Sequence, residues 1–440
     1  MKKLIYIDTS KITVKKILYA VLTVLIPIIC VGGASYFPYT FRLPFMYITA
    51  IIFAVTFVFS DLKIRLSFPS VCFLLLLSYI AISIIFSLDP ASTASLFLIY
   101  LCSATMLFLD LPQAVYHRII FIMYVICIII AFSIVISVFI DDFINKYLWI
   151  IVNPGRSSET ISAIRKELSL GAYSGLAREK AEAAYIMNVG IAISFARYFS
   201  KSKFEKFELL FLIILFAALI LTGKRTFFLI PIICFIVLIT ISKSKNKAIK
   251  FLSVMLISAV ALFVIMMFFP EMANIFYRFA DSENMESMGN RDLIWKYMFM
   301  MISDYWAFGG GFGSFNQYAY DHGFRVYNEK WEYNAHNSYF QVIGELGIIG
   351  ITLLALFIIS SLFITITLIS KLKDKNKLEL LYVSLCIQIM LAIYSVTGNP
   401  LYTKQILFIW LFSIGIMLHV KSSCEYIPQK LPVRRNYNHG

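Results

Sequence analysis

The sequence predicts an all-α, polytopic integral membrane protein with about twelve transmembrane helices and two long extracytoplasmic loops. Of the 440 residues, 60% are hydrophobic and only 15% are charged, and the mean hydropathy is +0.81. A soluble domain carries about 25% charged residues and cannot keep this much apolar surface out of water. The apolar residues fall in continuous runs of about 20, which is the length of a helix that crosses the hydrocarbon core. Continuous runs favour helices over the alternating strands of a barrel.

Twelve stretches fit this length: 17–37, 43–60, 68–87, 93–111, 119–140, 183–199, 207–223, 226–242, 250–270, 338–370, 379–397 and 404–420. The stretch 338–370 is predicted to be one long element. The first stretch follows Lys15 and Lys16 and has no small-residue cleavage motif after it. We therefore expect a retained helix rather than a removed signal peptide. Together the stretches predict one membrane domain over residues 1–440, with a cytoplasmic tail at 421–440.

The basic residues predict the orientation of these helices. With the N-terminus in the cytoplasm, the inner segments hold most of the 39 lysines and arginines. The short outer loops then hold only Arg42, Lys224, Arg225 and Lys404. This is the positive-inside distribution, and it places both termini in the cytoplasm. The net charge of +14 thus faces anionic lipid headgroups of the bilayer and does not indicate nucleic acid as a partner.

Two outer segments are long, one from 141 to 182 and the other from 271 to 337. Loops of this length are uncommon unless they are functional, so we expect the chemistry on the extracytoplasmic face. Six of the seven cysteines lie in apolar runs, and none forms a C-x-x-C pair. We expect buried, free cysteines, no required metal and no cofactor.

Three cationic motifs lie at predicted outer helix starts. The first is Gly223-Lys224-Arg225-Thr226, where Lys224 and Arg225 precede an apolar helix. A cation at a helix start is unfavourable unless an anion joins it. The alternative is a pair of snorkelling interfacial side chains.

The second motif is Asn290-Arg291-Asp292-Leu293-Ile294-Trp295. Asn290 is a plausible N-cap, and Arg291 and Trp295 would share one face of a half-buried helix that lies on the membrane. The alternative is an interfacial amphipathic helix with ordinary Trp and Arg anchors.

The third motif is His336-Asn337-Ser338-Tyr339-Phe340-Gln341. Ser338 and Gln341 have the spacing of a capping box, which would place His336 at the entrance of the long helix. A lone histidine is more often structural. Together, however, three helix starts with free amides and the side chains of Lys224, Arg225, Arg291 and His336 predict a site for phosphate or pyrophosphate.

Other polar residues are weaker candidates. Arg178 and Glu179 in the first long loop lie close to the next membrane helix, and Glu345 is either a site carboxylate or a packed acceptor between helices. The segment Gly309-Gly310-Gly311-Phe312-Gly313 lacks the lysine of a P-loop and predicts a flexible or tight turn. Gly344, Gly347 and Gly350 recur at a spacing that favours close helix packing.

These motifs, in this order, resemble the O-antigen ligase/polymerase superfamily of bacterial envelope glycosyltransferases. The similarity is strongest over 207–369 and includes the segment Trp306-Ala307-Phe308-Gly309-Gly310 and the run Gly344-Glu345-Leu346-Gly347. The resemblance implies metal-independent glycosyl transfer at the periplasmic face of the inner membrane, from a glycan on undecaprenyl pyrophosphate, within lipopolysaccharide or polysaccharide biosynthesis.

In that resemblance, Arg225 and Arg291 clamp the pyrophosphate, and His336 contacts it or activates the acceptor hydroxyl. Lys224, Asn337 and Trp295 are expected to bind substrate. Arg178 and Glu179 are also expected to bind substrate because they lie close to the next membrane helix, whereas the basic loop from Arg165 to Lys180 departs from the family pattern and takes no role from the resemblance. The motif around His336 favours a polymerase over a ligase. A chain-length regulator and a flippase are the implied partners. A transporter or flippase for lipid-linked oligosaccharide is the alternative of another class, and it expects ionisable residues deep in the spans, which are nearly absent here.

Overall fold

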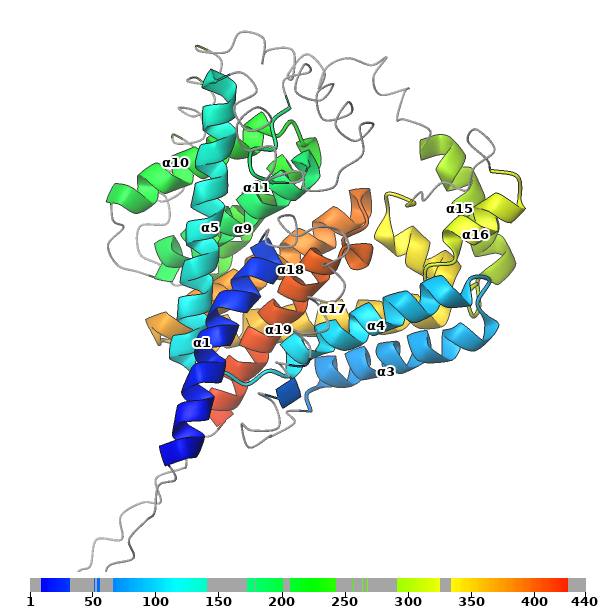
Figure 1. Cartoon of the computed structure of the whole chain (residues 1–440), viewed down its shortest axis with the longest axis horizontal. Helices are drawn as coiled ribbons and strands as arrows, with labels where there is room; N and C mark the ends of the chain where they lie inside the picture. Colours follow the sequence, from blue (N-terminus) through cyan, green and yellow to red (C-terminus); the bar gives the residue numbers. More distant parts are fainter. Residues whose placement is uncertain are drawn as a thin grey trace, which may run out of the picture.

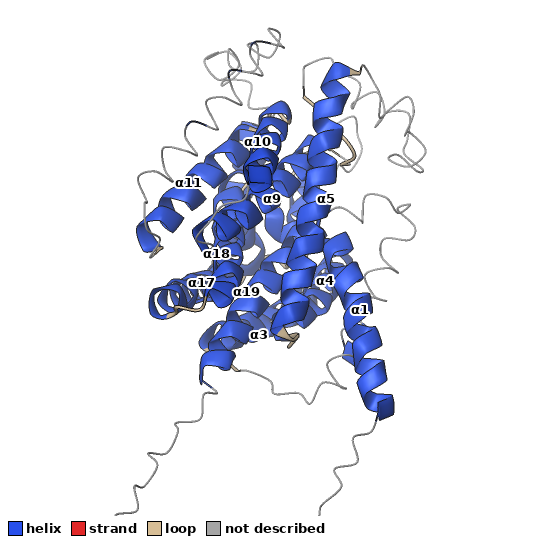
Figure 2. Ribbon diagram, turned by 90° about the vertical axis from the view of Figure 1, so that its left-hand side faces the viewer, coloured by secondary structure: helices blue, strands red, loops and turns tan. Residues whose placement is uncertain are grey.

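The computed structural model describes residues 9–31, 66–140, 172–177, 179–200, 206–242, 291–324 and 334–425, with a few isolated positions. Within them the chain forms α-helices and loops without strands (Figure 2). The α-helices are α1 (Thr9–Val31), α3 (Phe68–Ser83), α4 (Pro90–Phe108), α5 (Gln113–Phe139), α9 (Lys180–Ser200), α10 (Lys206–Leu221), α11 (Arg225–Ile241), α15 (Arg291–Tyr305), α16 (Phe315–Asp321), α17 (Ser338–Lys371), α18 (Lys375–Thr397) and α19 (Lys404–Glu425), joined in places by the 3₁₀ turns η2 (Ile84–Phe86) and η4 (Pro400–Tyr402).

The predicted fold class is confirmed. Seven of the described helices are long and apolar enough to cross a membrane, and α10 and α11 are shorter apolar helices. The predicted spans 43–60 and 250–270 lie outside the described residues, apart from isolated positions, and each of the others coincides with a helix. The first predicted long loop and the tail lie largely outside the described residues as well, whereas the second predicted long loop contains α15 and α16.

The centre of the bundle is formed by α9 and α18. α9 is buried along nearly its whole length, although it contains Ala, Gly, Asn and Ser as well as large apolar residues. α18 packs against α9, α11, α17 and α19, while α17 runs along α3 and α19 along α4 (Figure 1). A helix that is buried all round needs no lipid-facing stripe, which accounts for the mixed composition of α9.

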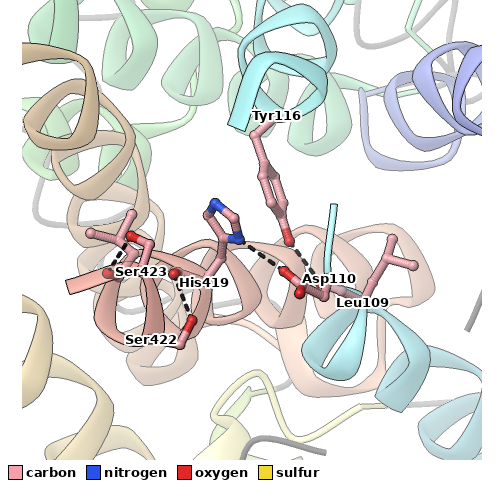
Figure 3. A network of polar contacts seen from close by, with 7 residues as sticks. Leu109, Asp110, Tyr116, His419, Ser422 and Ser423 are labelled. Carbon is pink, nitrogen blue, oxygen red and sulfur yellow. Dashed lines mark hydrogen bonds and ion pairs between the residues drawn. The ribbon is translucent and has the colours of Figure 1, made fainter. Parts of the chain in front are cut away.

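The helix ends sort into two opposite ends of the bundle. At one end, the amide of Leu88 donates to the carbonyl of Gly310 (2.8 Å), just before α4 begins. At the other, His419 near the end of α19 pairs with Asp110 just after α4 (Nδ1–Oδ1 2.9 Å), beside the ring of Tyr116 (Figure 3). Tyr116 donates its hydroxyl hydrogen to the carbonyl of Leu109 (2.7 Å). This up-and-down arrangement is what the predicted topology requires, and its direction across the membrane stays a prediction.

The long predicted element 338–370 is not a continuous helix. α17 breaks at Gly347, where φ is 62° and ψ is −164°. The amide of Ile348 donates to the carbonyl of Trp306 (2.8 Å) instead of continuing the helical ladder. The carbonyls of Gly344 and Glu345, freed by the break, accept from the amides of Gly310 and Gly311. These two residues belong to the glycine loop, residues 309–313. The break therefore joins α17 to the segment that follows α15, and α15 and α16 lie at one edge of the bundle (Figure 1).

Candidate functional site

Two of the predicted cationic motifs meet at the last turn of α18. The amide and the hydroxyl of Ser338, at the start of α17, both donate to the carbonyl of Gly398 (3.0 and 3.1 Å). The ring of Phe227, in the first turn of α11, lies with its centroid 4.4 Å from that of Tyr394. In each motif, the residue that contacts the end of α18 lies two residues after the cationic residue. Stretches more than a hundred residues apart are brought to the same end of the bundle.

His336 is exposed and is held in an unusual backbone conformation. Among the described residues other than glycine, only His336 has a positive φ, of 52°. Its neighbours are fixed on both sides. The amide of Ala335 donates to Gln341 Oε1 (3.1 Å), the carbonyl of Ala335 accepts from Trp295 Nε1 (2.8 Å), and Asn337 caps the following helix. A left-handed residue other than glycine costs on the order of 1 kcal/mol and is typical of functional sites.

The predicted capping box of Ser338 and Gln341 is wrong. Asn337 is the N-cap, and its Oδ1 accepts from the amides of Tyr339 (3.0 Å) and Phe340 (3.1 Å). The amide of Ser338 is bonded to the end of α18, and that of Gln341 to the carbonyl of Asn337. The first-turn amides of α17 are therefore already bonded, and the expectation of free amides at this helix start is also wrong. Asn337, predicted to bind substrate, uses its side-chain oxygen to cap α17.

The start of α11 has a different character. Gly223 turns the chain with a φ of 66°, Lys224 is the extended N-cap residue, and Arg225 is the first helical residue. A lysine side chain has no acceptor, so it does not cap the amides of the first turn. Arg225 is exposed and Lys224 half-buried. A helix start carrying two cations is suited to an anion.

Arg291 is the first residue of α15, as predicted. Its side chain, Asn290 and Arg178 lie outside the described residues. Trp295, one turn further along α15, is half-buried, and its ring lies 6.1 Å from that of Phe340 in a T-shaped arrangement. Through the hydrogen bond of Trp295 to Ala335, the helix that begins at Arg291 is tied directly to the residue before His336.

Replacing Trp295 by phenylalanine tests this tie. Phenylalanine keeps most of the apolar contact with Phe340 but loses the indole donor, so the carbonyl before His336 loses its partner. One such hydrogen bond contributes about 1 kcal/mol, and we expect a roughly fivefold lower rate of polysaccharide synthesis with unchanged protein level. Trp306→Phe is the matched control because its indole is 63% exposed. An equal effect of both changes would contradict the proposed tie.

Glu345 is a fully buried acceptor that organises this end of the bundle. Its two carboxylate oxygens accept from the amides of Gly313 (2.7 Å) and Phe315 (3.2 Å), from Gln341 Nε2 (3.0 Å) and from the hydroxyl of Tyr402 (2.6 Å). Burial, and then the negative charge of Glu345, raise the pKa of Tyr402, so its hydroxyl stays a donor at neutral pH. The sequence left two roles open for Glu345, and the structure makes it the acceptor that joins the glycine loop, α17 and η4.

A chain of side-chain amides links Glu345 to His336 and was not predicted from the sequence. Gln341 donates to Glu345 and accepts from the amide of Ala335, and Asn399 donates to the same Gln341 oxygen. Gln341 and Asn399 are 2% and 7% exposed. The available signal was the i, i+4 spacing of Gln341 and Glu345 in an otherwise apolar stretch, which puts both on one helix face.

Glu179 also reaches this end of the bundle. Its carbonyl accepts from the amide of Ala183 (2.9 Å), so it stands directly before the first turn of α9. Its side chain is exposed and lines a pocket that it shares with Tyr394 of α18. Of the predicted site residues, the structure thus brings Arg225, Lys224, Glu179, Trp295, Asn337 and His336 to elements around one end of α18. Among the described residues, no group of three or more His, Cys, Asp or Glu forms a metal site.

The fold and this arrangement define a multi-pass membrane protein with polar and cationic groups gathered at one end of an apolar bundle. Residues 210–355 match the O-antigen ligase family, which confirms the resemblance to the O-antigen ligase/polymerase superfamily. The match runs from α10 to the middle of α17 and includes Arg225, Arg291 and His336, but not Glu179. A comparison with curated proteins gives no match.

Proposed function

We propose that the protein is a metal-independent glycosyltransferase, an O-antigen or related polysaccharide polymerase. In this reaction an undecaprenyl-pyrophosphate-linked glycan is transferred to another lipid-linked repeat unit at the periplasmic face of the inner membrane. The observation that carries the proposal is the meeting of the stretches around Arg225 and His336 at one end of α18, with α15 tied to the second through Trp295. The family match over 210–355 supports the reaction class.

The chemistry requires cations at this position. The bond between sugar C1 and the pyrophosphate oxygen breaks, and its electron pair leaves with undecaprenyl pyrophosphate. An acceptor hydroxyl oxygen bonds to C1 and loses its proton. Negative charge grows on the leaving group, so Arg225 and Arg291, with Lys224, stabilise the transition state more than the ground state. His336, fixed in place by its neighbours, contacts the pyrophosphate or takes the proton of the acceptor.

A ligase is the second candidate because the matched family carries that name. A ligase performs the same transfer onto lipid A–core. The transporter alternative has less support. Glu345, the buried carboxylate of α17, accepts four hydrogen bonds and lies near one end of its helix, not at the midplane where a translocation site is expected.

The test is a gene deletion complemented with wild type, Arg225→Ala, Arg291→Ala or His336→Ala, with envelope polysaccharide separated on a gel. We expect each variant to lose the long-chain ladder at normal protein levels. A single repeat still attached to the core indicates a polymerase, and loss of all attached repeats indicates a ligase. Arg118→Ala is the control, because Arg118 is exposed and lies near the start of α5, at the opposite end of the bundle from the proposed site. Unchanged ladders in all three site variants would disprove the proposed site.

A further inference from the structure

A pocket next to the proposed pyrophosphate site has no role in the reaction as described so far. It has a volume of about 110 Å³ and opens between the first turn of α9, the end of α18 and the start of α19. Its lining includes Glu179, Glu182, Tyr394, Thr403 and Gln405. A cavity needs about 10–15 Å³ in this measure to hold one water, so the pocket has room for several.

The charge of the lining disfavours a second phosphate. Two of the eight lining residues are glutamates, and none is a lysine or arginine. Both glutamates lie at the start of α9, where the positive end of the helix dipole stabilises negative charge. A phosphate would be repelled from this pocket, whereas the start of α11 nearby carries the opposite charge.

The lining suits an uncharged, hydroxyl-bearing ring. Carboxylates accept strong hydrogen bonds from hydroxyl groups, and the threonine hydroxyl and glutamine amide can both donate and accept. Tyr394 and Ile406 add aromatic and apolar surface beside these polar groups. A few polar groups placed beside aromatic surface are the usual composition of a small-molecule site.

The position of the pocket fixes its relation to the reaction. Tyr394, which lines the pocket, also packs against Phe227, two residues after Arg225. The pocket and the proposed pyrophosphate site therefore border each other through one pair of rings. We propose that this pocket binds one uncharged, hydroxyl-bearing sugar ring of the lipid-linked substrate. The proposal rests on the glycosyltransferase function above and assigns the ring next to the reacting bond, in either the donor or the acceptor, to Glu179, Glu182 and Gln405.

The full-length protein in lipid nanodiscs tests the assignment. Glu179→Gln removes the charge of an exposed side chain, and Ala181→Leu fills the pocket without changing charge. Two ligands are compared: undecaprenyl pyrophosphate without sugar, and the lipid-linked repeat unit that accumulates in the deletion strain. We expect both variants to bind the sugar-free lipid within twofold of wild type and the glycan-bearing lipid at least tenfold more weakly. Asp321→Asn, an exposed carboxylate of α16, should change neither.

Donor and acceptor rings are separated by the slow transfer of glycan to water. If hydrolysis and polymer formation fall together, the pocket holds the donor ring, and if only polymer formation falls, it holds the acceptor ring. Wild-type binding of glycan-bearing lipid by both variants would overturn the pocket assignment alone. Equal weakening of sugar-free lipid would overturn it as well, because the pocket would then serve the pyrophosphate. A wild-type protein that binds neither lipid would overturn the proposed function and the pocket together.

Discussion

Glu345→Ala is expected to lower the free energy of unfolding by on the order of 3–5 kcal/mol and to abolish polysaccharide synthesis, because buried donors lose their acceptor. The carboxylate accepts from two loop amides, from Gln341 and from Tyr402, and its side chain is fully buried. Alanine leaves these donors without a partner. Thermal unfolding of the detergent-purified protein and the polysaccharide ladder in the complemented deletion strain measure the two effects.

The conservative change Glu345→Gln separates packing from hydrogen bonding. Glutamine fills the same space, but its amide nitrogen cannot accept from Tyr402 or from the Gly313 amide. We therefore expect Glu345→Gln to lose most of the stability and polysaccharide synthesis that Glu345→Ala loses. Glu379→Gln is the matched control because Glu379 is a mostly buried carboxylate, paired with Arg197 (3.7 Å) at the opposite end of the bundle. It should cost some stability and leave the rate of synthesis per folded molecule unchanged. A Glu345→Gln protein with wild-type stability and activity would contradict the role given to Glu345.

The fold class could be predicted because its signal is local. Each apolar run contains the information for its own helix, and even α9, whose composition is mixed, was found from its length and position. The break in α17 could not be found in this way. The residues around Gly347 are compatible with a continuous helix, and the groups that replace the helical ladder, such as the carbonyl of Trp306, come from a segment about forty residues earlier. The sequence pattern of one helix cannot reveal a hydrogen-bond partner that lies in another segment.

In the candidate site, too, local features could be predicted from the sequence and contacts between distant segments could not. Cations at helix starts are visible in the sequence, and the structure places Arg225 and His336 on elements around the end of α18. The cap of α17 was misassigned because the Ser338 hydroxyl is taken by a carbonyl of α18, which leaves Asn337 to cap the helix. The amide of Asn399 reaches Gln341 across 58 residues of sequence. Hydrogen bonds between distant polar residues depend on the packing of the helices and had no local signal.

Gly347→Ala is expected to destabilise the protein by about 3 kcal/mol or more and to reduce polysaccharide synthesis severely. The conformation of Gly347, with φ 62° and ψ −164°, is essentially restricted to glycine and costs other residues about 1–3 kcal/mol. An added Cβ would also lie 2.3 Å from the carbonyl oxygen of Ala307, so either the loop or the helix must move. Either movement would displace the glycine loop, which donates a hydrogen bond to Glu345.

Gly323→Ala is the comparison without a close contact. Gly323 also has a positive φ, of 88°, but an added Cβ there meets nothing within 4 Å. Backbone strain alone should cost about 1 kcal/mol at this position. The difference between the two unfolding temperatures, measured in the same detergent, therefore reports the close contact between α17 and the loop after α15 together with the greater backbone strain at Gly347. If Gly347→Ala proved no more destabilising than Gly323→Ala, the broken helix would not be the element that holds the glycine loop in place, and the path from Glu345 to His336 would have to rest on the side-chain amides alone.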